Sequence, residues 1–190
     1  MTDAEIRAAF HRKKLRREHH DPDSLVIDEL GLQYGKCRAD IAIVGRQLVG
    51  YEIKSDVDSL RRLDQQIRGY SSVFDEVSLV VGQRFMAEAA SIIPQWWGII
   101  VARLGPRGAI HFGTIKVAEN NPRVDNYSVL QLLWRTELIG ILSEMGLKQD
   151  VFRQRRSVLC QTLVACVEPE TVRNLVRSRL TQRREWRDRR

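Results

Sequence analysis

The 190-residue sequence has few cysteines and no long apolar run, and each absence excludes a class of protein. Three cysteines with no CxxC pair form neither a disulfide framework nor a zinc motif, which favours a reducing, cytoplasmic setting. The apolar runs are short and interrupted, so we expect no membrane-spanning segment and no secretory signal. The G-x-x-x-x-G-K-[ST] pattern of a nucleotide-binding loop is also absent, so an ATP-driven activity would need a partner protein.

The positive charge is concentrated at the two ends of the chain. The formal net charge is +7, with +3 in residues 1–20 and +6 in residues 173–190, which leaves −2 for the residues between them. Two interpretations of the basic ends stay open: solvated amphipathic helices, or arms that contact phosphates. Trp186, within the last basic segment, is the aromatic residue that we consider for a contact with a base or a partner.

Hydrophobic periodicity predicts an α/β protein, with a mixed central sheet flanked by helices and a helical extension at its C-terminal end. We expect residues 1–118 to form the core and residues 119–190 the helical region, with 24–34 ambiguous between helix and strand. The expected helices of the core are 3–19, 58–74 and 83–93, and its expected strands are 38–44, 48–55, 77–82, 97–104 and 109–117.

Three charged residues lie in two consecutive apolar strands that we expect to form a hairpin. Asp40 is near the start of the first strand, and Glu52 and Lys54 share one face of the second because they are two residues apart. Charges among apolar neighbours are costly unless they are paired or bind a metal ion. Two carboxylates brought together repel each other, and a divalent cation relieves that repulsion. The carbonyl oxygen of Ile53 lies between the two charged side chains and is a further candidate ligand.

The helix after the hairpin adds two candidate residues. Gln66 and Tyr70 are four residues apart and therefore share a helical face. We expect Asp58 to cap the start of this helix. Upstream, Glu29 is an acid inside an apolar segment and a candidate metal ligand, with Asp28 as the competing choice.

The pattern Asp40 … Glu52-Ile53-Lys54, followed by Gln66-x-x-x-Tyr70, resembles the PD-(D/E)XK nuclease superfamily, and its Gln-x-x-x-Tyr element is similar to RecB-type nuclease domains. The wider phrasing is most similar to a small, largely uncharacterised prokaryotic group of that superfamily. The resemblance implies a restriction-endonuclease-like core. It also implies metal ligation by Glu29, Asp40 and Glu52, with Lys54 as the catalytic lysine and Gln66 and Tyr70 positioning substrate or supporting the site. Ala39 replaces the proline of the superfamily's name.

From these residues we expect a Mg²⁺- or Mn²⁺-dependent phosphodiesterase. We expect its substrate to be DNA in preference to RNA, and we interpret it as an endonuclease. The alternative is a non-enzymatic nucleic-acid-binding or accessory module on the same fold. A third interpretation makes the C-terminal helices an interaction surface for a homodimer or a larger assembly, and it is compatible with the first.

Overall fold

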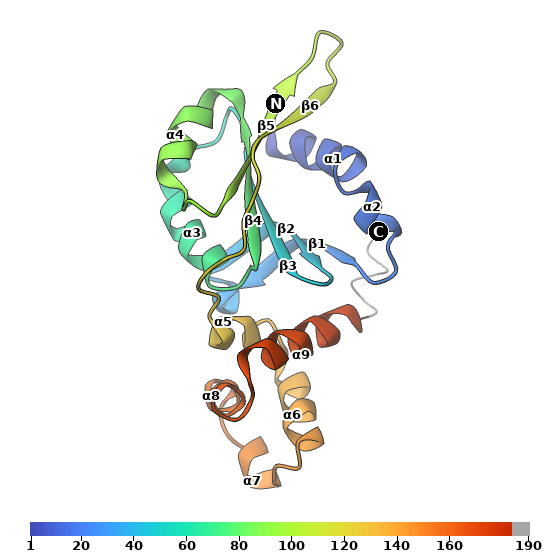
Figure 1. Ribbon diagram of the computed structural model, residues 1–190, viewed down its shortest axis with the longest axis vertical. Coiled ribbons are helices and arrows are strands. Elements are labelled where there is room, and N and C mark those ends of the chain that lie inside the picture. The colour runs from blue at the N-terminus through green and yellow to red at the C-terminus, as the bar shows by residue number, and fades with distance from the viewer. Residues whose placement is uncertain (184–190) are drawn as a thin grey trace.

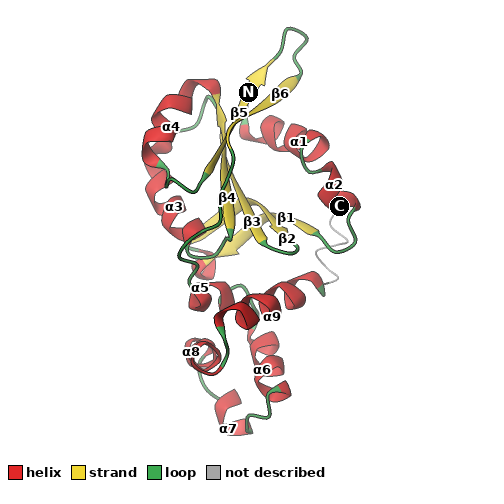
Figure 2. Ribbon diagram, in the orientation of Figure 1, coloured by secondary structure: helices red, strands yellow, loops and turns green. Residues whose placement is uncertain are grey.

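The computed structural model describes residues 1–183, so the contact considered for Trp186 lies outside the described residues. Its centre is a six-stranded sheet in which the strands follow one another in chain order (Figure 2). The strands are β1 Leu25–Leu32, β2 Cys37–Val44, β3 Leu48–Lys54, β4 Glu76–Gly82, β5 Gly98–Leu104 and β6 Ile110–Lys116. The ambiguous segment 24–34 is therefore largely a strand.

The sheet is mixed. Antiparallel pairing joins β1 to β2, β2 to β3, and β5 to β6, whereas β3, β4 and β5 run parallel. The parallel strands need crossover connections, and the segments between them are helical. The expected α/β class with a mixed central sheet is confirmed.

The helices are shorter than the periodicity predicts. Those before β6 are α1 Asp3–Lys13, α2 Arg16–His20, α3 Leu63–Ser71 and α4 Met86–Ile92. Those after it are α5 Asn126–Leu130, α6 Arg135–Glu144, α7 Gln149–Phe152, α8 Arg156–Cys166 and α9 Pro169–Thr181. Short 3₁₀ turns cover Gln33–Gly35, Leu60–Arg62 and Gln83–Phe85. The helix expected over 3–19 is thus two helices, and the one expected over 58–74 begins with a 3₁₀ turn.

The expected helix cap at Asp58 is wrong. Its Oδ2 accepts hydrogen bonds from the Ser55 amide at 2.8 Å and the Ser55 hydroxyl at 2.6 Å, so it closes the turn after β3. The Ser59 hydroxyl instead accepts from the Arg61 amide at the start of the 3₁₀ turn. Regular helix begins at Leu63, after the 3₁₀ turn.

Two apolar clusters cover the two faces of the sheet. On one face, Ile6, Phe10 and Leu15 pack against strand residues such as Ile41 and Ile53. On the other face a larger cluster joins the sheet to α3, α4 and the C-terminal helices. Figure 1 shows α1 and α2 across the sheet from α3 and α4, with α6, α7 and α8 beyond one end of it. Among the described residues, no helix combines the length and apolar character needed to cross a membrane.

Candidate active site

The candidate site lies where β2 and β3 stop pairing. Their antiparallel ladder runs from Val44 and Leu48 to Ile41 and Tyr51 and ends there. Beyond it, side chains take over the backbone hydrogen bonds: the Ile53 amide donates to Asp40 Oδ2 at 2.7 Å, and the Asp40 amide donates to the Tyr70 hydroxyl at 2.9 Å. At the end of the ladder, these two hydrogen bonds therefore hold the Asp40 carboxylate and the Tyr70 hydroxyl in place.

Glu52 is the centre of a buried polar group. Its side chain is 0% exposed, and both of its oxygens accept hydrogen bonds. Lys54 Nζ lies 2.5 Å from Oε1, which also accepts from the Gln66 side-chain Nε2, and the Tyr70 hydroxyl donates to Oε2 at 2.6 Å. Glu52, Lys54, Gln66 and Tyr70 thus lie together, as their spacing in the strand and in the helix predicts. Asp40 is linked to Glu52 through the Tyr70 hydroxyl, which hydrogen-bonds to both residues.

Burial dominates the electrostatics of the two carboxylates. Desolvation, followed by the charge of Glu52, raises the pKa of Asp40 to about 7, although the Ile53 amide and Arg7 act in the opposite direction. Desolvation also raises the pKa of Glu52, against the opposing charge and hydrogen bond of Lys54. The Tyr70 hydroxyl is so deeply buried between these acids that its pKa lies well above the usual value, and it stays a neutral donor.

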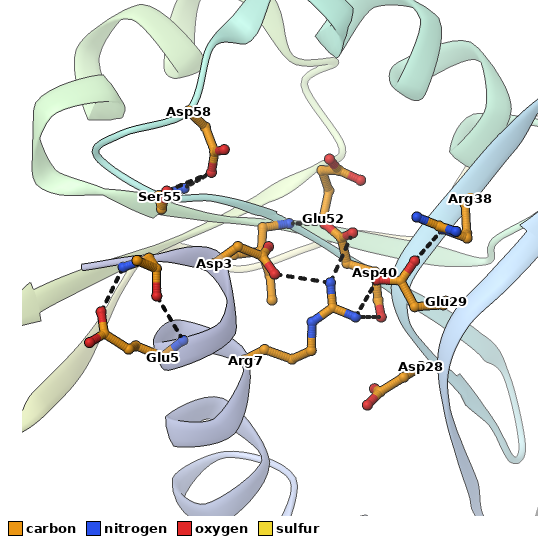
Figure 3. Close-up of polar contacts among 12 residues, drawn as sticks. Asp3, Glu5, Arg7, Asp28, Glu29, Arg38, Asp40, Glu52, Ser55 and Asp58 are labelled. Atoms are coloured by element: carbon orange, nitrogen blue, oxygen red, sulfur yellow. Dashed lines mark hydrogen bonds and ion pairs between the residues drawn. The ribbon is translucent and has the colours of Figure 1, made fainter.

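Sequence reasoning missed Arg7, which reaches the site from α1 (Figure 3). Its guanidinium lies 2.5 Å from Glu29 Oε1, 3.3 Å from Asp40 Oδ1 and 3.1 Å from Asp3 Oδ1, and it also donates to the Asp40 carbonyl at 3.1 Å. The signal was available only in part: Asp3 and Arg7 have the spacing of a helical ion pair, and Ile6 beside them belongs to the apolar edge. We call Asp3, Glu29, Asp40 and Glu52 the acidic cluster.

Glu29 sits at an irregularity of β1. Its φ of 57° is left-handed, which for a residue other than glycine costs about 1–2 kcal/mol. It has no Cα partner in the ladder, whereas Asp28 and Leu30 pair with Ile41 and Ala39 on either side of Asp40. The strained residue therefore lies across from Asp40, and Arg7 and the exposed Arg38 both contact its carboxylate. Backbone strain of this kind is often found at functional sites.

Asp28, the competing choice, points elsewhere. Its Oδ1 pairs with His11 Nε2 at 2.9 Å, one helical turn beyond Arg7 on α1. Between the two acids, the structure thus brings Glu29, and not Asp28, into contact with the residue that binds Asp40.

A family model described as bacteriophage P4 protein cII matches residues 2–189. The chain belongs to the phage P4 cII family. Protein cII of Enterobacteria phage P4 is 30% identical to it over 143 residues, 74% of this chain and 54% of that protein, so the chain spans about half the length of this relative. A solved structure of a protein of unknown function from Silicibacter pomeroyi has a TM-score of 0.45 and 18% identity, covering 73% of this chain and 88% of that one.

The donor set of this cII-family protein suits a hard divalent cation. Among the described residues, no three His, Cys, Asp or Glu side chains converge closely enough to hold a metal ion by themselves. Nevertheless, the four carboxylates of the acidic cluster outnumber the three cations paired with them, Arg7, Arg38 and Lys54. In addition, Gln66 Oε1 is buried without a hydrogen-bond partner beside Glu52. An excess of carboxylates over cations and an unsatisfied buried oxygen are features that Mg²⁺ or Mn²⁺ would relieve.

Proposed function

We propose that this cII-family protein is a metal-dependent nuclease that hydrolyses phosphodiester bonds, with DNA as the expected substrate. One observation carries the proposal: Asp40, Glu52 and Lys54 are held together, largely out of solvent, where two strands diverge. Two desolvated carboxylates with raised pKa values beside a buried lysine cost stability, and such arrangements concentrate at functional sites.

The proposed cation would be held by Asp40, Glu52 and the carbonyl oxygen of Ile53. When bound, Mg²⁺ or Mn²⁺ would polarise the phosphoryl oxygen and lower the pKa of a water. Lys54 would contribute a fixed positive charge to the phosphate as negative charge grows on it. Glu29 would enter the ligand set only by leaving Arg7 and Arg38, which bind it in this structure.

Gln66 and Tyr70 would act through Glu52 and are positioning residues in this proposal. Both donate to the Glu52 carboxylate, and Tyr70 also accepts from the Asp40 amide. They fix the orientation of one proposed ligand and the position of the strand that carries the other. Such support matters because small displacements of catalytic groups reduce rates strongly.

The test is a nuclease panel on the purified chain. Supercoiled plasmid, linear duplex, single-stranded DNA, a flap substrate and RNA are incubated with Mg²⁺, Mn²⁺ or EDTA. Cleavage is expected with either metal and not with EDTA, and Glu52→Gln and Lys54→Met are each expected to reduce it by about 100-fold or more. Glu88→Gln and Lys148→Met are matched controls, because both residues are exposed and distant in sequence from the site.

Two outcomes would overturn the proposal. One is the absence of cleavage of every substrate with both metals, and the other is cleavage that Glu52→Gln leaves unchanged. Salt-sensitive DNA binding without metal-dependent cleavage would instead support the accessory module. One contact favours that second candidate: the Arg7 guanidinium pairs with Asp3, Glu29 and Asp40 and so neutralises part of the acidic cluster.

A further inference from the structure

A run of five cations joins α1 to α2. Arg12, Lys13, Lys14, Arg16 and Arg17 surround the buried Leu15, and each of the five residues is exposed. Lys13 Nζ donates to the Ile110 carbonyl at 2.7 Å. The ion pairs between described residues include none of the other four. The run therefore presents five positive charges, none of them in an ion pair with a described residue, and Asp21 offsets part of the charge of Arg17.

The run borders a groove between α1, α2 and β1. The groove has a volume of about 1030 Å³, with Arg12 and Arg16 on the helical side and Val26, Ile27 and Leu30 among the residues from β1. A second hollow of about 660 Å³ shares Arg16 and His20 with it. Because β1 is an edge strand, no strand of residues 1–183 pairs with its outer edge. Cations beside apolar surface suit a ligand that has both anionic and apolar parts.

The groove leads to the candidate active site through Glu29. This residue lines the groove and also pairs with Arg7, which in turn pairs with Asp40. A chain of phosphates lying along α2 and entering the groove would therefore continue toward the acidic cluster. The basic run supplies the attraction that the carboxylates of the cluster cannot supply.

We propose that the basic run and this groove bind the sugar–phosphate backbone of a nucleic-acid strand and direct it to the acidic cluster. The inference names the substrate-binding surface of the proposed nuclease and so rests on that function, but binding is measured separately from cleavage. Each phosphate that a cation contacts releases condensed counterions, so contacts are counted by the salt dependence of affinity.

The test measures fluorescence anisotropy of labelled single-stranded and duplex DNA in EDTA, over a series of salt concentrations. The variant Arg12→Gln/Arg16→Gln/Arg17→Gln is compared with Lys148→Gln/Arg153→Gln/Arg155→Gln, which removes the same charge from exposed residues of the C-terminal region. For a single strand, the first variant should lower the log–log salt slope by about 2 and the affinity by tenfold or more at about 100 mM salt. The second should stay within about twofold of wild type.

The binding result and the cleavage result can fail independently. Glu52→Gln should bind DNA at least as well as wild type in EDTA, so loss of cleavage with normal binding leaves this inference standing. Equal losses in the two triple variants would overturn it, because attraction would then follow net charge alone. Absence of salt-dependent binding by wild type would also overturn it. The single charge reversal Arg16→Glu should lower DNA affinity more than Arg153→Glu does. A smaller loss for Arg16→Glu would contradict the placement of the DNA strand along the basic run.

Discussion

Asp40 should make the protein less stable as the pH rises, and Asp40→Asn should remove that dependence. The folded-state pKa of Asp40 is about 7, whereas its ordinary value is 3.8. A group whose pKa is raised by folding binds its proton more tightly in the folded state. Its stabilising contribution is complete below pH 3.8 and is lost as the pH rises through 7.

The magnitude follows from the size of the shift. One pKa unit corresponds to about 1.4 kcal/mol, so a fully ionised Asp40 costs about 4 kcal/mol relative to the protonated side chain. Between pH 5 and pH 8 the change is about 2 to 3 kcal/mol, because part of the loss occurs below pH 5. Replacing Asp40 by the neutral asparagine should therefore stabilise the fold progressively over this interval.

The assay is urea unfolding of wild type and Asp40→Asn at pH 5, 6, 7 and 8, without metal. The free energy of unfolding of the variant minus that of wild type should increase by about 2 to 3 kcal/mol from pH 5 to pH 8. Asp28→Asn is the matched control on the neighbouring strand. Burial raises the pKa of Asp28, but the hydrogen bond and charge of His11 outweigh burial and lower it. Because that pKa is lowered, the stabilisation by Asp28 is already complete above its ordinary pKa of 3.8, so Asp28→Asn should show no comparable increase between pH 5 and pH 8. A difference for Asp40→Asn that is flat or falls with pH would refute the reasoning.

Four substitutions and the addition of Mg²⁺ give further tests by thermal or urea unfolding. Tyr70→Phe should lose about 1–3 kcal/mol, because the buried Glu52 carboxylate and a buried amide each lose a partner; an unchanged midpoint would contradict those bonds. Arg7→Gln should lose about 1–2 kcal/mol at pH 8 and less at pH 5, where Asp40, whose pKa is about 7, is largely protonated. Gly50→Ala should lose about 1–3 kcal/mol, since its Cβ would lie 2.7 Å from an aromatic ring, whereas Gly140→Ala, with open space in α6, should gain up to about 1 kcal/mol. Mg²⁺ at 100 times its Kd should stabilise wild type by about 2.7 kcal/mol, and it should stabilise Asp40→Asn much less.

The local parts of the site were predictable because they depend on short-range periodicity. Glu52 and Lys54 share a face because strands alternate every two residues, and Gln66 and Tyr70 share one because a helical turn takes about four. The mixed sheet follows from the same patterns. The parallel pairing of β3 with β4 does not, because it joins residues separated by a helix, and sequence pattern alone does not give the partner.

Arg7 was missed for a related reason. It lies 33 residues before Asp40, and their contact exists only because the apolar edge of α1 docks on the sheet. Asp58 was misassigned because its carboxylate could bond either to the turn after β3 or to the start of the following helix. In the structure it accepts both of its hydrogen bonds from Ser55, in that turn. Both errors concern charged side chains whose partners are chosen by tertiary packing and by competition, not by spacing.

Arg7 also links the two uses proposed for the N-terminal helices. Its guanidinium pairs with Glu29 and Asp40, and α1 continues directly into the basic run. A cation bound at Asp40 would compete with Arg7 for that carboxylate, since two positive charges at one oxygen repel each other. A nucleic-acid strand in the groove would pass beside Glu29, where its phosphates would in turn attract the displaced guanidinium. Metal and nucleic acid would then favour the same rearrangement of Arg7, so each should bind more tightly when the other is present, and by linkage the two enhancements must be equal.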